Sequence, residues 1–142
     1  RTIKAIDYVV DYRKTVLRAD EIIYSIILPL PTDNEVVKMY KISKRIDMDI
    51  STLSTAFRLK LSNNKVEFIS MVYGGMAAMT IHATEAEQFL TGKEWNEDNI
   101  AEAAAILEKT FTPLSDARSG AEFRNIAAGN ILKKFYEESK LN

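Results

Sequence analysis

The sequence predicts an α+β fold: an antiparallel sheet covered on one face by about three helices, in a two-layer sandwich. Two observations predict it. From about residue 36 to residue 72 the chain has strand-like runs, one of which alternates apolar and polar residues with a period of two. After about residue 84, apolar residues recur every three or four positions, which is typical of helices. Because the strands precede the helices, sheet and helices form separate layers.

The composition limits the function classes. The chain has 142 residues and a net charge of −1, which argues against a general nucleic-acid or membrane-surface binder. It has no cysteine, so it cannot form disulfides, ligate iron–sulfur clusters or use a thiolate nucleophile. His82 is the single histidine, which disfavours a multi-histidine metal site or a Ser-His relay. We therefore expect no metal site and no catalytic residue, although a carboxylate site stays open.

Residues 1–30 are expected to form two strands and a turn. Tyr8–Val10 is a short apolar run, and Ile22–Leu28 is rich in β-branched residues and bounded by Pro29. The Pro-rich stretch Pro29–Asn34 is the best candidate for a linker or domain boundary.

The next part is expected to be a meander of strands. Residues 36–43 form the first strand, and residues 51–61 the second, with its apolar side chains on one face. Asn63-Asn64 tolerates positive φ and predicts a tight hairpin, after which residues 65–72 return antiparallel. Gly74-Gly75 is expected to end or bulge that strand. A short strand is expected to follow within Met76–Ile81.

The rest of the chain, from about residue 84, carries sequence motifs that are typical of helix starts. Thr84–Glu87 and Ser119–Glu122 each fit a capping box, and Asn96 fits an N-cap. Gly129 stands in the middle of the last helix, where glycine costs about 1 kcal/mol relative to alanine. We attribute it to close approach of another element. Arg124, near the start of this helix, is expected to form a structural ion pair with Asp116 or Glu122.

The turn between the first two strands of the meander is densely charged. Lys44, Arg45, Asp47 and Asp49 lie within residues 44–49. A turn does not need such charge density, so the segment either meets an anionic ligand or crosses a subunit boundary. The two carboxylates could serve a cation or acid–base chemistry, but such residues more often bond turn amides or neighbouring basic side chains.

Lys41 precedes the turn and is the main candidate for a binding residue. Strand periodicity places it on the face opposite Tyr40 and Ile42. A lysine in this position is either simply exposed or lies at the edge of a cofactor. There an ammonium would stabilise a developing anion such as a reduced flavin.

Several motifs, in order, carry a family resemblance. The chain resembles the C-terminal domain of the flavoprotein component of molybdenum hydroxylases, as in the FAD subunit of xanthine dehydrogenases. The segments that carry it are Tyr40–Leu61, Val72–Ala77, Leu90–Asn96, Ser115–Arg118 and Glu122–Arg124. Upstream, Asp11–Thr15 and Asp20–Pro29 resemble the last strands of the preceding FAD-binding subdomain. The resemblance implies two parts, with residues 1–31 trailing from that subdomain and residues 32–142 forming the C-terminal domain.

The resemblance also implies site residues. Lys41 matches a family lysine near the flavin, and Ile23 matches an aliphatic residue that packs against it. The turn from Ile42 to Ser51 matches a mobile loop that influences NAD access. Ile46 and Met48 stand where the animal enzymes carry Arg and Asp, so the electrostatic control by that loop does not carry over. The Gly-rich segments that hold the FAD pyrophosphate are not in this sequence, so the FAD site is incomplete here.

As the resemblance implies, electrons pass from molybdopterin through iron–sulfur clusters on other chains or domains to FAD, and then usually to NAD. The expected partners are those subunits and the upstream FAD-binding subdomain, with no nucleic acid and no membrane. Holoenzymes of the family are commonly dimers of heteromers, which leaves a homo-oligomer open. We expect a cytoplasmic protein and a piece of a longer one. The alternatives are an aldehyde, nicotinate or carbon monoxide dehydrogenase medium subunit, or a docking module without a cofactor role.

Overall fold

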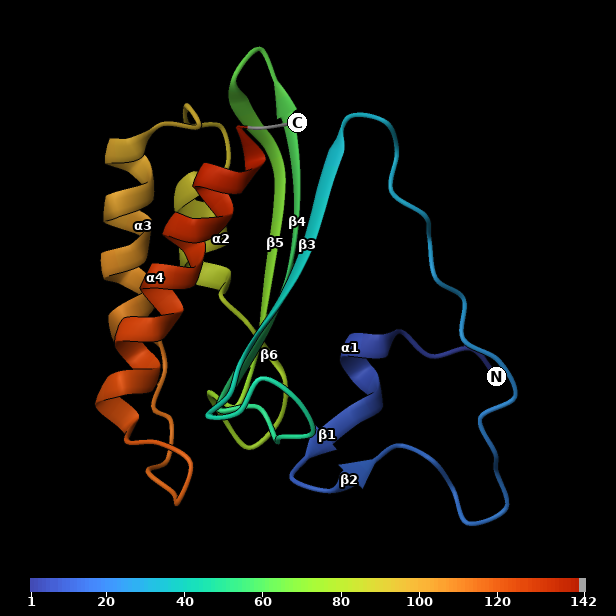
Figure 1. Ribbon diagram of the computed structural model, residues 1–142. Helices are drawn as coiled ribbons and strands as arrows, with labels where there is room; N and C mark the ends of the chain where they lie inside the picture. Colours follow the sequence, from blue (N-terminus) through green and yellow to red (C-terminus); the bar gives the residue numbers. More distant parts are fainter. Residues whose placement is uncertain (141–142) are drawn as a thin grey trace.

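The computed structural model describes residues 1–140 and confirms the α+β two-layer sandwich (Figure 1). One layer is a four-stranded antiparallel sheet in the order β3-β4-β5-β6. The helices pack on one face of this sheet. The elements are β3 (Glu35–Ile42), β4 (Leu53–Ser62), β5 (Lys65–Gly74), β6 (Ile81–His82), α2 (Thr84–Leu90), α3 (Glu97–Thr110) and α4 (Ala121–Ser139).

Alternation along β4 determines which face of the sheet is buried. Leu53, Phe57 and Leu59 point toward the helices and are at most 1% exposed. The expected hairpin between β4 and β5 is confirmed, because Asn63 and Asn64 have φ angles of 49° and 60°. This turn pairs Ser62 with Lys65, and an irregularity between Lys60 and Leu61 then shifts the register of the remaining pairs.

Aromatic side chains fill the space between the layers. The ring of Phe57 lies 5.4 Å from that of Tyr73 and 5.3 Å from that of Phe135 on α4. Trp95 packs edge-on against Phe135, and its indole nitrogen donates a hydrogen bond to the Ser139 hydroxyl at 2.9 Å. Tilted and edge-to-face contacts of this kind add about 0.5–1.5 kcal/mol per pair beyond the burial of area. They join the C-terminal helix to the sheet.

Of two expected helix-start motifs, one forms and the other does not. The Asn96 side chain accepts the amide of Asn99 at 3.0 Å, which confirms the expected N-cap of α3. The Thr84–Glu87 capping box is wrong: α2 begins after Ala83, with no side-chain cap. The Glu87 carboxylate instead accepts the Met71 amide at 2.6 Å and lies 3.0 Å from the His82 ring. The donor, the Met71 amide, lies on the sheet, so a local motif could not predict this contact.

The capping box expected at Ser119–Glu122 is also wrong. Gly120 occupies the N-cap position of α4 without a side-chain bond. Ser115 takes over the capping role from farther back in the chain, since its hydroxyl accepts the Ala121 amide at 3.0 Å. In mid-helix, a Cβ on Gly129 would lie 3.0 Å from the Ala104 carbonyl oxygen of α3. Close helix–helix approach therefore explains this glycine, as expected.

Residues 1–34 lie outside the sandwich. They include α1 (Ala5–Tyr8), β1 (Val9–Asp11) and β2 (Lys14–Thr15), and none of them is buried. The strand expected over Ile22–Leu28 is wrong, because this segment has no regular secondary structure. A strand needs a partner for its backbone groups, and none of the described residues pairs with it.

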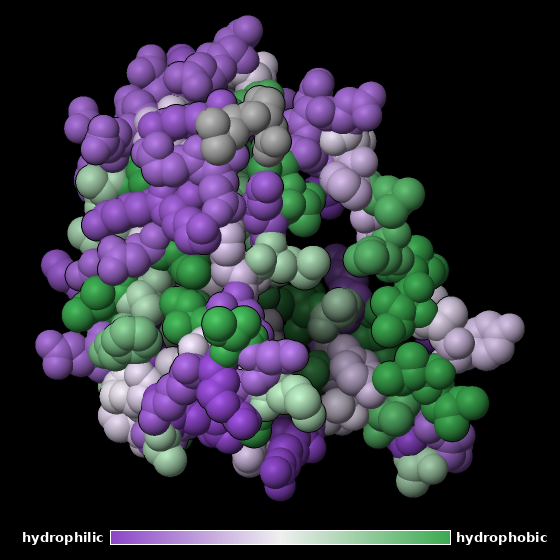
Figure 2. All heavy atoms as spheres, in the orientation of Figure 1, coloured by the Kyte–Doolittle hydropathy of each residue, from purple (hydrophilic) through white to green (hydrophobic). Residues whose placement is uncertain are grey.

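The apolar residues of this segment face solvent. Figure 2 shows hydrophobic side chains gathered over the part of the molecule away from α2, α3 and α4, where Figure 1 draws the N-terminal segment. The exposed fraction is 85% for Ile22 and 94% for Tyr24. In a second departure from expectation, Met76–Met79 is part of a bend, and only Ile81 of the expected Met76–Ile81 strand pairs with β5. None of the helices formed by residues 1–140 has the length and apolar character needed to cross a bilayer.

Candidate functional site

Lys41 lies on the exposed face of the sheet, opposite the helices. Its neighbour Tyr40 points the other way, and the Tyr40 hydroxyl donates a hydrogen bond to Glu138 of α4 at 2.8 Å. Burial and this bond raise the pKa of Tyr40, so the phenol stays protonated and holds β3 against α4. With that residue fixed, the strand pleat directs Lys41 outward.

The cross-strand neighbours of Lys41 form a short row on the exposed face of the sheet. Lys41 is paired with Ser54, and Ser54 with Gly74, across three adjacent strands. A Cβ on Gly74 would lie 2.6 Å from the Ser54 hydroxyl oxygen, so a larger residue would displace that hydroxyl. We call Lys41, Ser54 and Gly74 the polar row. It offers a cation and a hydroxyl on the exposed face of the sheet.

The charged turn, residues 43–50, covers one end of the polar row. The Lys41 ammonium donates a hydrogen bond to the Asp49 carbonyl oxygen at 2.6 Å. The Asp49 carboxylate accepts the amides of Arg45 and Ile50, at 3.0 and 2.9 Å. The bond from the Arg45 amide is the main cause that lowers the pKa of Asp49. Asp49 thus satisfies turn amides, the structural alternative for this carboxylate, and Asp47 likewise accepts the Met48 amide.

The two candidate flavin contacts come from different parts of the molecule. Ile23 is 56% exposed and lies in the irregular segment that runs outside the sandwich, which Figure 1 draws apart from β3. Lys41 lies at the end of β3 beside the charged turn. The described residues therefore do not bring these two side chains together, and their roles stay predictions.

The polar row offers a cation and a hydroxyl, groups that can contact the edge of a cofactor ring, but it lacks the features that hold a pyrophosphate. A pyrophosphate is usually held by several backbone amides of a Gly-rich loop at a helix end. The sequence has only five glycines and no such loop.

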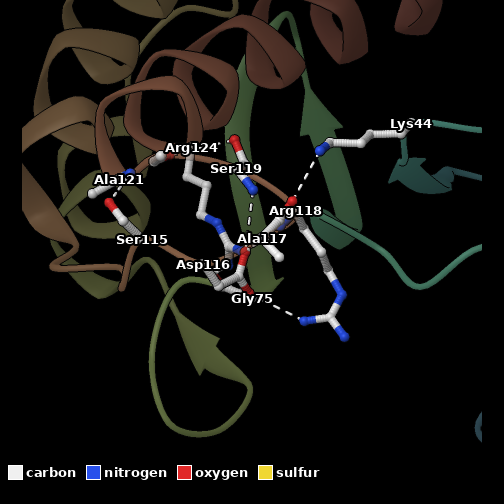
Figure 3. A network of polar contacts seen from close by, with 10 residues as sticks. Lys44, Gly75, Ser115, Asp116, Ala117, Arg118, Ser119, Ala121 and Arg124 are labelled. Atoms are coloured by element: carbon white, nitrogen blue, oxygen red, sulfur yellow. Dashed lines mark hydrogen bonds and ion pairs between the residues drawn. The ribbon is translucent and has the colours of Figure 1, made fainter.

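A second polar network lies beside the charged turn (Figure 3). Arg124 is 5% exposed and forms an ion pair with Asp116 at 2.8 Å, which confirms one of its two expected partners. Its other terminal nitrogen donates to the Gly75 carbonyl oxygen at 2.6 Å. Lys44, from the charged turn, donates to the Ala117 carbonyl oxygen at 2.9 Å.

Sequence reasoning missed some of these neighbours. Periodicity alone placed Ser54 on the outer face, but its position beside Lys41 depends on a register set by the turn at residues 43–50. The link from Lys44 to Ala117 spans 73 positions and leaves no local signal. His82 contacts Glu87 in a partly exposed pair, consistent with the structural alternative for the single histidine.

A family model and curated protein sequences match most of this chain. A family model described as the CO dehydrogenase flavoprotein C-terminal domain matches residues 38–139. Xanthine dehydrogenase from Oryza sativa subsp. japonica is 33% identical over 141 residues, which are 96% of this chain and 10% of that protein. Xanthine dehydrogenase from Emericella nidulans is 37% identical over 131 residues, 89% of this chain and 10% of that protein. The chain thus spans about a tenth of the length of these relatives.

Solved structures of two related-looking enzymes are similar to this chain. Reconstituted CO dehydrogenase from Oligotropha carboxidovorans is similar with a TM-score of 0.84 and 28% identity, over 94% of this chain and 46% of that chain. Quinoline 2-oxidoreductase from Pseudomonas putida reaches the same TM-score of 0.84 at 22% identity, which is a likeness in fold alone.

Proposed function

The chain belongs to the family of CO dehydrogenase flavoprotein C-terminal domains, and on this premise we propose that it forms one wall of the FAD site in a xanthine dehydrogenase-type molybdenum hydroxylase. Membership in the family confirms the resemblance noted in the sequence. The proposed role includes electron transfer from iron–sulfur clusters to FAD and then to NAD, with the molybdopterin and iron–sulfur groups on other chains or domains. The chain alone is then not an autonomous enzyme.

The observation that carries the proposal is the placement of Lys41. Its ammonium is exposed at the end of β3, anchored at 2.6 Å to the Asp49 carbonyl oxygen and flanked by Ser54. Bound FAD would supply the two-electron chemistry at its ring system. A fixed cation at the ring edge would stabilise the negative charge that develops on reduction, since charge pairs interact strongly where water is excluded.

We further propose that residues 1–31 belong to an upstream FAD-binding subdomain and residues 32–142 to the C-terminal domain. The exposure of the apolar residues at 22–30 supports this division, because contiguous exposed apolar residues are typical of a surface that packs against another one. Ile23 would then pack against the flavin once the upstream subdomain fixes its segment.

The first experiment measures FAD binding through quenching of flavin fluorescence. It compares this chain, the missing upstream segment and the two mixed together. The proposal expects tight binding only in the mixture. If the upstream segment binds FAD equally well without this chain, the chain does not complete a flavin site.

A matched pair of variants then tests Lys41. Lys41→Met removes the cation beside the charged turn. Lys60→Met removes a cation from the same face at the other end of the sheet, where Lys60 pairs with Glu67. In the assembled flavoprotein, Lys41→Met should lower the flavin reduction potential and Lys60→Met should leave it unchanged.

The second candidate function is a docking module for the iron–sulfur and molybdopterin parts. The observation that favours it is the same exposed apolar run, at which Leu28 and Leu30 are 79% and 81% exposed. Docking without a flavin role predicts that Lys41→Met changes neither FAD affinity nor the flavin potential. In that case substitutions in the 22–30 run weaken subunit assembly instead. A holoenzyme that acts on aldehydes, nicotinate or carbon monoxide stays an alternative within the family.

A further inference from the structure

Arg124 is a buried charge that joins three separate segments. It lies in the first turn of α4 and is 5% exposed. One terminal nitrogen donates to Asp116 at 2.8 Å and the other donates to the Gly75 carbonyl oxygen at 2.6 Å. Burying a guanidinium is costly unless it is paired and hydrogen-bonded, so these contacts require the neighbouring loops to stay in place.

Asp116 turns this ion pair into a fixed loop. Its carboxylate accepts the amides of Arg118 and Ser119 at 2.9 and 3.1 Å, in addition to the Arg124 guanidinium. The bond from the Arg118 amide is the main cause that lowers the pKa of Asp116 to about 2. The carboxylate is therefore ionised at neutral pH, and the loop at residues 115–119 is held against the start of α4.

The fixed loop presents the Ala117 carbonyl oxygen to the charged turn. Lys44 donates to it at 2.9 Å, and Figure 3 draws this side chain reaching across from the turn. Within the turn, Asp49 accepts the Arg45 amide, and the Asp49 carbonyl accepts the Lys41 ammonium. The position of the Lys41 ammonium thus depends on a turn that is tied to the helical layer through Lys44.

Arg124 also reaches the other end of the polar row. Gly75 directly follows Gly74, the member of the row farthest from Lys41. Gly75 has a φ of +83°, and a Cβ there would lie 2.7 Å from the Thr52 carbonyl oxygen. One guanidinium thereby holds the Gly74-Gly75 strand end directly and the charged turn through Ala117.

We propose that Arg124 is a positioning residue that sets the location of the Lys41 ammonium by holding the charged turn and the Gly74-Gly75 strand end. The significance of this role for electron transfer rests on the proposed flavin function of Lys41. The positioning itself does not, and the two are tested by different readouts.

The test uses the full-length flavoprotein in its assembled complex and measures amide hydrogen exchange in residues 43–50. Arg124→Lys keeps the charge but cannot reach Asp116 and Gly75 together. It should raise exchange in the charged turn about tenfold, the size expected for one lost hydrogen bond to a charged group. Arg118→Lys is the matched control, because Arg118 also contacts Asp116, at 3.1 Å, but is exposed. It should change exchange less than about twofold.

Lys44→Met tests whether Arg124 acts on the charged turn through the bond from Lys44 to Ala117. Alone, it should loosen the charged turn while leaving the burial of Arg124 intact. In the Lys44→Met background, Arg124→Lys should add little further exchange in residues 43–50, because residues in one network are not additive. A full additional increase, equal effects of Arg124→Lys and Arg118→Lys, or a uniform rise that includes the β4–β5 hairpin would each overturn the proposal. If Arg124→Lys does not fold, Asp116→Asn provides the same comparison.

The flavin reduction potential separates this inference from the proposed function. If both hold, Arg124→Lys shifts the potential in the same direction as Lys41→Met, by a smaller amount. If exchange responds as expected but neither variant moves the potential, the positioning role stands and the flavin role of Lys41 fails. If Lys41→Met moves the potential while exchange in Arg124→Lys stays at the wild-type level, the flavin role stands and the positioning role fails.

Discussion

Large apolar side chains form a buried core in the sandwich but are exposed in the N-terminal segment. In the sandwich, Phe57 and Leu107 are at most 1% exposed, because the helices cover the inner face of the sheet. In residues 1–34 no residue is buried, and Ile22 is 85% exposed. Both regions are rich in β-branched and aromatic residues, so composition does not explain the difference. In the sandwich the helices cover the inner face of the sheet, whereas none of the described residues buries the apolar side chains of the N-terminal segment.

The ion pairs of the two regions also differ in how far they are buried. The N-terminal segment is held by exposed pairs such as Arg1 with Glu21, at 2.7 Å. Exposed ion pairs of this kind contribute little to stability. In the sandwich the ion pair of Arg124 with Asp116 is partly buried and shares its atoms with backbone groups. The sandwich therefore has a buried core of its own, whereas residues 1–34 contribute no residue to it.

The largest expected effect comes from opening the core of the sandwich. Phe57→Ala removes a ring that packs on Tyr73 and Phe135, and it should lower the free energy of unfolding by about 3–5 kcal/mol. Ile27→Ala, at a position that is 82% exposed, should change it by less than about 0.5 kcal/mol. Urea unfolding of both variants checks the contrast. Similar losses would mean that the N-terminal segment is packed as firmly as the sandwich.

Two glycines of the sandwich share a backbone conformation but differ in the space around them. Gly75 and Gly92 have φ angles of +83° and +82°, so alanine is strained at both by about 1–2 kcal/mol. At Gly75 a Cβ would also approach the Thr52 carbonyl oxygen to 2.7 Å, whereas nothing lies within 4 Å at Gly92. Gly75→Ala should therefore cost about 1–3 kcal/mol more than Gly92→Ala in urea unfolding. Equal costs would show that the loop at Gly75 is free to move.

Removal of residues 1–31 tests whether the sandwich stands alone. Because none of these residues is buried, the truncated chain should keep one cooperative urea transition. Its free energy of unfolding should differ from that of the full chain by less than about 1 kcal/mol, the range of exposed pairs and surface contacts. A broad or lost transition would mean that the segment contributes to the core in solution.

The same contrast explains what the sequence could and could not predict. The sheet layer followed from the alternation around Phe57 and from the Asn63-Asn64 turn, since both signals are local. The strand expected at Ile22–Leu28 failed because β-propensity reports a suitable surface, not the presence of a partner.

Both capping boxes failed for a related reason. The Glu87 carboxylate accepts the Met71 amide of the sheet, and the Ser115 hydroxyl accepts the Ala121 amide from outside the expected box, so neither box forms. At the candidate site, the outward direction of Lys41 and the ion pair of Arg124 with Asp116 could be anticipated. The polar row and the link from Lys44 to Ala117 could not, because both depend on strand register and loop packing.

The smallest expected effect separates two carboxylates that share a low pKa for different reasons. The pKa of Glu21 is about 2 chiefly because the exposed Arg1 guanidinium bonds to it, and the pKa of Asp116 is about 2 chiefly because the Arg118 amide does. Both pKa values lie below the ordinary ones of 4.5 and 3.8, so each group stabilises its region above those values. That contribution is lost as the pH falls toward about 2.

High salt should distinguish the two groups. Screening weakens the exposed Arg1–Glu21 pair, so at about 1 M salt the pKa of Glu21 should rise toward its ordinary value. The pKa of Asp116 should move less, because backbone amides in a fixed loop are not displaced by salt. Carboxyl carbon chemical shifts followed by NMR across the acid range at low and high salt measure both values. Equal shifts would mean that the Asp116 loop is as open to solvent as the N-terminal segment, and that Arg124 does not fix it.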